Sequence, residues 1–124
     1  MEQTNFEKTQ IYQLAEKLSN LIWEYVLTWD SFPRDTVGKQ LVRAADSIGA
    51  NIAEGSGRGS SIDHRKFLRI ARGSLYETKS FLRRAHTRQL LTTEQMNTLK
   101  PLVNELAPKL NAYIKRVDAN ISNT

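Results

Sequence analysis

Apolar positions recur every three or four residues in four stretches of the chain, which is the spacing of amphipathic helices. These stretches predict helices over residues 4–29, 34–55, 61–88 and 93–121. Breaks fall at residues 30–33, in a run rich in glycine and serine at 55–61, and at 90–93. Four amphipathic helices with short connections predict a single all-α domain spanning 1–124, an antiparallel up-down-up-down four-helix bundle.

Residues typical of helix ends support these boundaries. Pro33 suits the first turn of the second helix, where its missing N–H group is no loss. Ser60 with Asp63 has the spacing of an N-cap and its reciprocal acid, and Thr92 with Gln95 has the spacing of a second capping box. Both pairs stand immediately before an apolar-periodic stretch, so they predict where the third and fourth helices begin.

Two prolines, Pro101 and Pro108, fall inside the fourth apolar pattern. Each removes a helical hydrogen bond, but both lie opposite the apolar stripe. We therefore expect a helix that curves or kinks around its core, with a break near Lys100 as the alternative.

The first helix has apolar residues on two sides. Its main stripe predicts the core, whereas Tyr12, Trp23 and Leu27 fall on nearly the opposite side at 100° per residue. A monomer would leave these three side chains in water, so we predict that they form an oligomer interface.

The net charge of +5 is concentrated in one segment. Residues 58–88 hold nine Lys and Arg residues against two acidic ones, a net of +7, which indicates an anionic partner. Within this segment a row about 27 Å long faces away from the core, and it consists of Arg65, Arg69, Arg72, Tyr76, Lys79 and Arg83. Arginine pairs bidentately with phosphate and an exposed tyrosine can stack on an unpaired base, so the row predicts contacts with RNA or another nucleic acid. The alternative is a solvated face whose arginines pair with acids on neighbouring helices.

A polar stripe lies beside the apolar face of the second helix, and it consists of Gln40, Arg43, Ser47, Asn51 and Glu54. We favour a structural network over a site, with Glu54 paired to Arg43 or Arg58 and Asn51 capping backbone groups, because partly buried polar groups need partners. The following glycine- and serine-rich loop either ends a helix or, helped by Arg58, holds an anion. It lacks the Lys-Ser/Thr of a Walker loop.

Catalysis has little support in the sequence. His64 and His86 lie 22 residues apart on one predicted helix, about 33 Å of helical rise, so they cannot share a metal ion within one subunit. The chain has no cysteine and no arrangement that argues for a Ser-His-acid triad. We expect a protein that is not an enzyme and needs no metal or cofactor. Because no signal peptide and no apolar run of about 18 residues are found, we expect a cytoplasmic location and no membrane partner.

Two sequence motifs resemble one known family. The first is Gln40-x-x-Arg43-Ala44-Ala45-x-Ser47-Ile48-x-x-Asn51-Ile52-Ala53-Glu54-Gly55-x-x-Arg58, and the second is Phe67-Leu68-x-Ile70-Ala71-x-Gly73-Ser74-Leu75-x-Glu77. Together with Phe32-Pro33 and Gly38, they resemble the bacterial four-helix-bundle family first noted as reading frames in intervening sequences of 23S ribosomal RNA genes. The chain departs from the family pattern at Arg34-Asp35, where an acidic pair is common, and at the prolines of the fourth helix.

The resemblance implies a bundle that commonly assembles as a ring-like pentamer and has no established enzymatic activity. It also implies kinship with the accessory variability proteins of diversity-generating retroelements, which bind a reverse transcriptase and nucleic acid. Six motif residues fall in the polar network expected between the second and third helices: Arg43, Ser47, Asn51, Glu54, Arg58 and Glu77.

Overall fold

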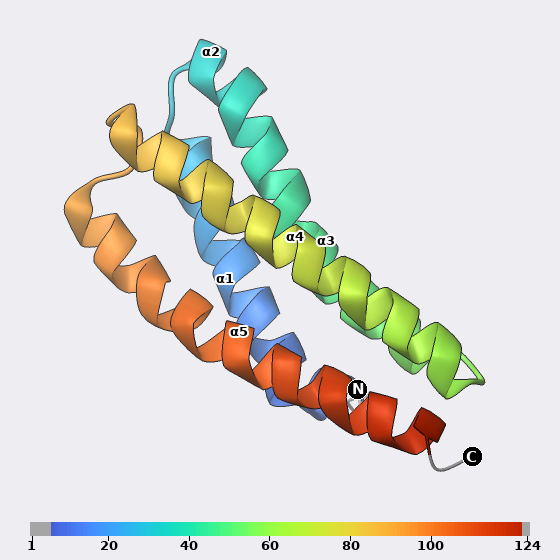
Figure 1. The fold of residues 1–124 in the computed structure, drawn as a ribbon. Coiled ribbons are helices and arrows are strands. Elements are labelled where there is room, and N and C mark those ends of the chain that lie inside the picture. Colours follow the sequence, from blue (N-terminus) through green and yellow to red (C-terminus); the bar gives the residue numbers. More distant parts are fainter. Residues whose placement is uncertain (1–5, 123–124) are drawn as a thin grey trace.

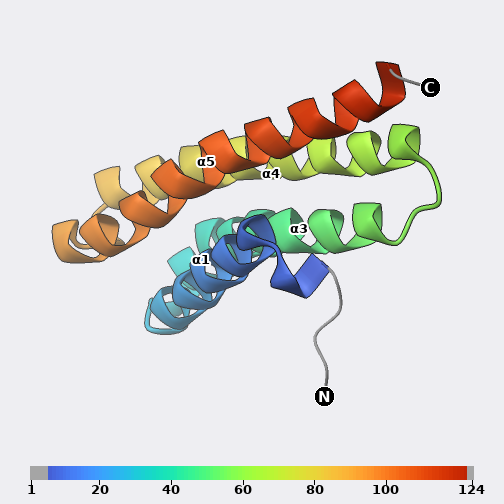
Figure 2. The same cartoon turned by 90° about the horizontal axis from the view of Figure 1, so that it is seen from below.

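The structure, a computed structural model, describes residues 6–122, which form a bundle of four long helices (Figure 1). The helices are α1 (Gln10–Leu27), α3 (Lys39–Ser56), α4 (Ser61–Thr87) and α5 (Thr93–Ser122). Helices α1 and α4 each pack against both α3 and α5, and successive helices run in opposite directions (Figure 2). No residue of this span is in a strand. The predicted antiparallel four-helix bundle is therefore confirmed.

Short helical segments precede α1 and α3. A 3₁₀ turn, η1 (Phe6–Lys8), comes before α1, and α1 begins at Gln10 because Thr9 caps it: the Tyr12 backbone N–H donates to Thr9 Oγ1 at 3.3 Å. The first helix is thus shorter than the predicted 4–29, whose first two residues lie outside the described span. The second helical stretch begins earlier than predicted, because α2 (Ser31–Pro33) and a π-helical segment, η2 (Arg34–Gly38), lead directly into α3.

Capping side chains begin the last two helices at the predicted residues, but among the described residues only the second pair is reciprocal, because no bond joins the Asp63 carboxylate to the Ser60 N–H. Ser60 Oγ accepts from the Asp63 backbone N–H at 3.2 Å at the start of α4. At the start of α5, Thr92 Oγ1 accepts from the Gln95 N–H, and Gln95 Oε1 accepts from the Thr92 N–H, both at 3.0 Å. These reciprocal bonds satisfy backbone donors that no helical carbonyl can reach.

Helix α5 is continuous through Pro101 and Pro108. Both prolines are exposed, while Leu99, Leu106 and Leu110 are fully buried on the other side of the helix. The missing N–H groups therefore fall on the solvent side, and the alternative of a break near Lys100 does not occur.

The core is mainly aliphatic and runs through all four helices. Its largest fully buried apolar side chains are Leu18, Ile22, Leu41, Ile48, Ile52, Leu68, Leu75, Leu99, Leu106 and Leu110. Of the described residues, none belongs to a helix long and apolar enough to cross a bilayer.

The second apolar side of α1 differs from the prediction at one position. Trp23 and Leu27 are 52% and 55% exposed, but Tyr12 is half-buried against the core. The Tyr12 ring meets the Phe6 ring edge-on at 5.0 Å, and it lies over Gly49 of α3, where an added Cβ would be 3.6 Å from Tyr12 Cε2. The ring therefore packs against α3 beside Gly49, and the expectation that Tyr12 lies in water is wrong.

Candidate nucleic-acid interface

The predicted basic row lies on α4 along its seam with α5. Arg69, Arg72 and Tyr76 line one surface pocket together with Lys115 and Asp118 of α5, among other residues. Farther along the seam, Lys79 and Arg83 line a second pocket with Lys100 of α5. We call the surface formed by the α4 row with Lys100 and Lys115 the basic groove. The row therefore does not point straight away from the bundle, as the spacing alone suggested, but borders a neighbouring helix.

Part of the row has partners on α5. Arg65 Nη1 lies 3.0 Å from Asp118 Oδ1, and Arg69 Nη2 lies 3.9 Å from the same oxygen. Arg72 Nη1 donates to Asn111 Oδ1 at 3.2 Å. Arg65, whose side chain is only 28% exposed, is thus paired with an acid on a neighbouring helix, as the alternative interpretation of the row predicted.

The remaining cations of the row have no acidic partner in the described part of the chain. Lys79 and Arg83 are exposed and form no ion pair there, and Lys79 Nζ lies 5.9 Å from the centre of the Tyr76 ring. The Tyr76 side chain is 54% exposed, so one face of the groove presents an aromatic ring between basic groups. This arrangement can meet phosphates and an unpaired base together.

Helix α5 adds two cations that sequence reasoning missed. The contacts of Arg65 with Asp118 and of Arg72 with Asn111 show the antiparallel register of the two helices. The same register places Lys100 opposite Arg83. The helical spacing of α5 shows that Lys100 and Lys115 lie off the apolar stripe, but only the register between helices shows which neighbour they meet.

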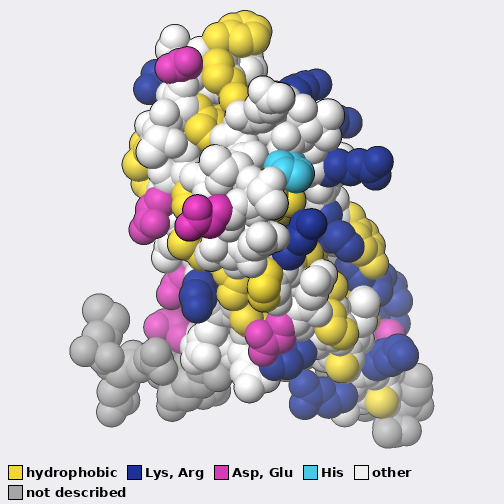
Figure 3. Space-filling view, turned by 90° about the vertical axis from the view of Figure 1, so that its left-hand side faces the viewer, with side chains coloured by type: hydrophobic (Ala, Val, Ile, Leu, Met, Phe, Trp, Pro, Cys, Tyr) yellow, Lys and Arg dark blue, Asp and Glu magenta, His cyan; other side chains and the backbone are white. Residues whose placement is uncertain are grey.

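The groove is strongly positive. Among the described residues that line its two pockets, Asp118 is the one carboxylate. Figure 3 shows Lys and Arg side chains gathered on the right of the view, while Asp and Glu lie mostly to the left. A cation-lined groove next to low-dielectric protein attracts anions and raises their local concentration.

The polar stripe of α3 meets α4 through a small hydrogen-bond network. Ser74 Oγ of α4 donates to Ser47 Oγ at 2.9 Å, and Asn51 Nδ2 donates to Ser47 Oγ at 3.0 Å and to the Ser47 carbonyl at 2.8 Å. Ser74 belongs to the second sequence motif, but its bond to Ser47 is not evident from the sequence. Its partly buried hydroxyl is satisfied only because Ser47 lies opposite on α3, so this network links the two helices.

Other residues expected in this network make different contacts. Glu54 pairs with Arg58 one turn later, and the Arg58 guanidinium lies over the Phe67 ring at 4.8 Å. Arg58 is therefore engaged with protein groups rather than turned to an anion at the start of α4. Arg43, Glu77 and Gln40 are exposed, and their side chains make no hydrogen bond or ion pair with another described residue, so they lie outside the network.

His64 lies where the start of α4 meets the ends of α3 and α5. Its Nε2 is buried without a hydrogen-bond partner, and its ring meets the Tyr113 ring edge-on at 5.8 Å. Burial lowers the pKa of His64 from its ordinary value of 6.5. No group of three His, Cys, Asp or Glu residues within the described span could hold a metal ion.

Comparison with known proteins identifies the family. The model of the family described as 23S rRNA-intervening sequence protein matches residues 7–112. The chain belongs to this family. The matched span includes all of α3 and α4, and therefore the whole α4 row of the basic groove.

A solved structure has the same architecture. It is the crystal structure of a protein of unknown function from the S23 ribosomal protein family of Bacteroides thetaiotaomicron VPI-5482, which is 28% identical to this chain. The match covers 85% of this chain and 94% of that one, with a TM-score of 0.71. No curated protein matches the chain.

Proposed function

We propose that this member of the 23S rRNA-intervening sequence protein family is a non-enzymatic scaffold that binds RNA, free or within a nucleoprotein, through the basic groove. The single observation that carries the proposal is the groove itself: six of its seven Lys and Arg side chains line two pockets whose described lining includes one carboxylate. Its α4 row is about 27 Å long, which matches several phosphates along a nucleic-acid backbone.

The contacts within the groove indicate how much each residue is expected to contribute to RNA binding. Arg65 is held by Asp118, so it contributes less free charge than Lys79 and Arg83, which have no acidic partner among the described residues. Tyr76 lies between these cations and can stack on any of the four bases. Binding is therefore expected to depend on phosphates and to fall steeply with salt, by up to about 0.9 log units per log unit of salt for each phosphate contacted.

The test reverses two charges in the groove and two elsewhere. Arg69→Glu with Arg72→Glu is compared with Lys17→Glu and Lys39→Glu, two exposed lysines on α1 and α3, so both variants change the net charge equally. Fluorescence anisotropy with a structured RNA should show a loss of at least tenfold in the groove variant and a smaller, salt-screened loss in the control. Equal losses would show that overall charge, and not the groove, governs binding.

We also propose that the protein is a homo-oligomer, a pentamer by family resemblance, and that Trp23 and Leu27 lie in the subunit interface. The two residues are one helical turn apart on α1 and more than half exposed, which favours a protein contact over exposure to water. Light scattering of Trp23→Ser with Leu27→Ser should then return a smaller mass than wild type. A wild-type monomer at micromolar concentration would refute the proposal.

A second candidate is an accessory protein-binding subunit, for example of a retroelement reverse transcriptase. The exposed Ile62 favours it: this side chain is 60% exposed and lies on the same side of α4 as Arg69, two turns away. An apolar residue in line with the basic row suits a protein surface better than a phosphate backbone. Co-purification with a reverse transcriptase that survives nuclease treatment and is lost in Ile62→Ser would favour this candidate, and loss of co-purification on nuclease treatment would favour RNA.

A further inference from the structure

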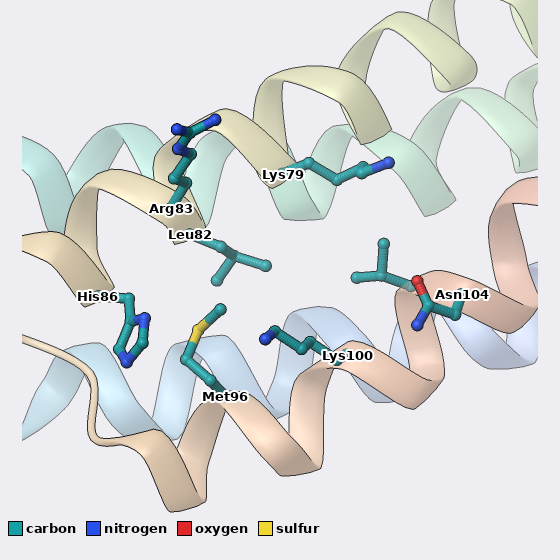
Figure 4. Close-up of a pocket in the computed structure, with 8 residues that line it drawn as sticks. Lys79, Leu82, Arg83, His86, Met96, Lys100 and Asn104 are labelled. Carbon is teal, nitrogen blue, oxygen red and sulfur yellow. The ribbon is translucent and has the colours of Figure 1, made fainter.

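A pocket of about 320 Å³ opens in the basic groove between the second half of α4 and the first half of α5 (Figure 4). Its apolar lining consists of Leu82, Met96 and Val103, all of which are buried. Leu82 of α4 and Met96 of α5 point toward each other across the gap (Figure 4). The floor of the pocket is therefore apolar, although the surface around it is cationic.

The rim of the pocket carries charge and hydrogen-bonding groups. Lys79, Arg83 and Lys100 border it, and none of them forms an ion pair with another residue in the described span. His86 and Asn104 lie at opposite ends (Figure 4). Their ring nitrogens and side-chain amide can donate and accept hydrogen bonds. Among residues 6–122, no acidic side chain lines the pocket.

These features match the chemistry of one unstacked nucleotide. A nucleobase has apolar faces and hydrogen-bonding edges, and the phosphates on either side of it are negative. The pocket volume lies at the lower end of the range of small-molecule sites, about 300–1,000 Å³, which suits one nucleotide better than a stack of bases. The base would lie against Leu82 and Met96, and its phosphates would lie near the three rim cations.

We infer that this pocket binds a single unstacked nucleotide of single-stranded RNA. The inference rests on the proposed function and adds to it a preference for single-stranded over duplex RNA. A small amphipathic carboxylate would also suit the apolar floor and a cation, but it would leave the rest of the groove unused. The basic groove continues past one end of the pocket to Arg72 and Arg69, where the strand on one side of a bound nucleotide can lie.

Two asparagines of α5 provide a matched pair of variants. Both are exposed, but Asn104 borders the pocket and Asn97 does not. Anisotropy titrations with a single-stranded oligoribonucleotide and a duplex RNA of equal length compare wild type, Asn104→Leu and Asn97→Leu. We expect tighter binding of the single strand by wild type. Asn104→Leu should weaken single-strand binding about fivefold, the loss of one net hydrogen bond, and leave duplex binding unchanged. Asn97→Leu should change neither.

Met96 supplies a direct readout of pocket occupancy. The chain has two methionines, Met1 and Met96, so the ε-methyl NMR signal of Met96 is readily assigned in the full-length protein. The single-stranded oligoribonucleotide should shift this signal, and the duplex should leave it in place.

The outcomes separate this inference from the proposed function. Equal affinity for both RNAs, or a Met96 signal that the single strand does not move, would overturn the pocket and leave RNA binding by the groove standing. Failure of wild type to bind either RNA would overturn both. Decanoate serves as the probe for a small amphipathic carboxylate. If, at equal concentration, decanoate shifts the Met96 signal more than the oligoribonucleotide does, the nucleotide assignment is overturned in favour of an amphipathic carboxylate.

Discussion

Gly38 is the position where adding a single methyl group should disturb the bundle most. It is buried at the end of the π-helical segment, against Val26 and Trp29 near the end of α1. Its φ of −60° and ψ of −46° are ordinary helical values, so alanine would not strain the backbone. A Cβ added there would, however, lie 2.7 Å from Val26 Cγ1 and 3.2 Å from both Trp29 Cε3 and the Pro33 carbonyl oxygen. The cost of Gly38→Ala is therefore one of packing.

The expected magnitude follows from two opposing contributions. Replacing glycine by alanine inside a helix gains about 1 kcal/mol. Overpacking a close-packed core costs about 1–3 kcal/mol, and we expect the upper part of that range because Val26 and Trp29 are themselves buried and any shift must displace further core atoms. Gly38→Ala should thus lower the free energy of unfolding by about 1–2 kcal/mol.

Gly73 provides the control for this prediction. It lies in the middle of α4, is exposed, and, apart from the neighbouring backbone of its own helix, no atom lies within 4 Å of an added Cβ. Gly73→Ala should therefore raise the free energy of unfolding by about 0.5–1 kcal/mol, through helix propensity alone.

Urea unfolding followed by circular dichroism measures both variants. The protomer concentration must be equal throughout, because oligomerisation would make apparent stability depend on it. The two midpoints should move in opposite directions with unchanged m-values, and thermal midpoints should differ by roughly 4 °C per kcal/mol. A Gly38→Ala variant as stable as Gly73→Ala would refute the packing argument.

Three further predictions follow from single contacts. Burial lowers the pKa of His64, so the folded state binds fewer protons than the unfolded state as pH falls below about 6.5. The free energy of unfolding from urea titrations should therefore fall more between pH 7.5 and 5 for wild type than for His64→Leu. Equal losses of stability in the two proteins would contradict this prediction. Asp118→Asn removes the acidic partner of Arg65, a partly exposed pair, so the free energy of unfolding should change by less than about 1 kcal/mol. RNA affinity in anisotropy titrations should rise a few-fold with a steeper salt dependence, because the arginine is then free to meet a phosphate. Weaker binding would mean that Asp118 orients the arginine productively. Ser47→Ala and Ser74→Ala should each cost about 1 kcal/mol in urea unfolding and together less than their sum, because both lose one shared hydrogen bond; strict additivity would show that the bond contributes nothing.

Features that depend on local sequence were predictable. The capping residues Ser60 and Thr92 begin α4 and α5 because a helix N-terminus needs acceptors for its free N–H groups, a requirement that a few adjacent residues satisfy. The continuity of α5 follows from the same kind of argument, since the helical period puts Pro101 and Pro108 on the side away from the leucine stripe. Helical spacing likewise aligned the cations of α4 in one row.

The partners of those side chains were decided only by tertiary structure. The period of α4 says that Arg65, Lys79 and Arg83 share a side, but not that Asp118 reaches Arg65 or that Lys100 borders the pocket beside Arg83. Tyr12 is half-buried because Gly49 of α3 passes close to it, a contact that the pattern of α1 alone cannot contain. The sequence by itself therefore determined the helices, their ends and their apolar faces, because these depend on residues within a few turns. The register between α4 and α5 decides which cations remain free to bind an anion. That register is set by the packing of the whole bundle.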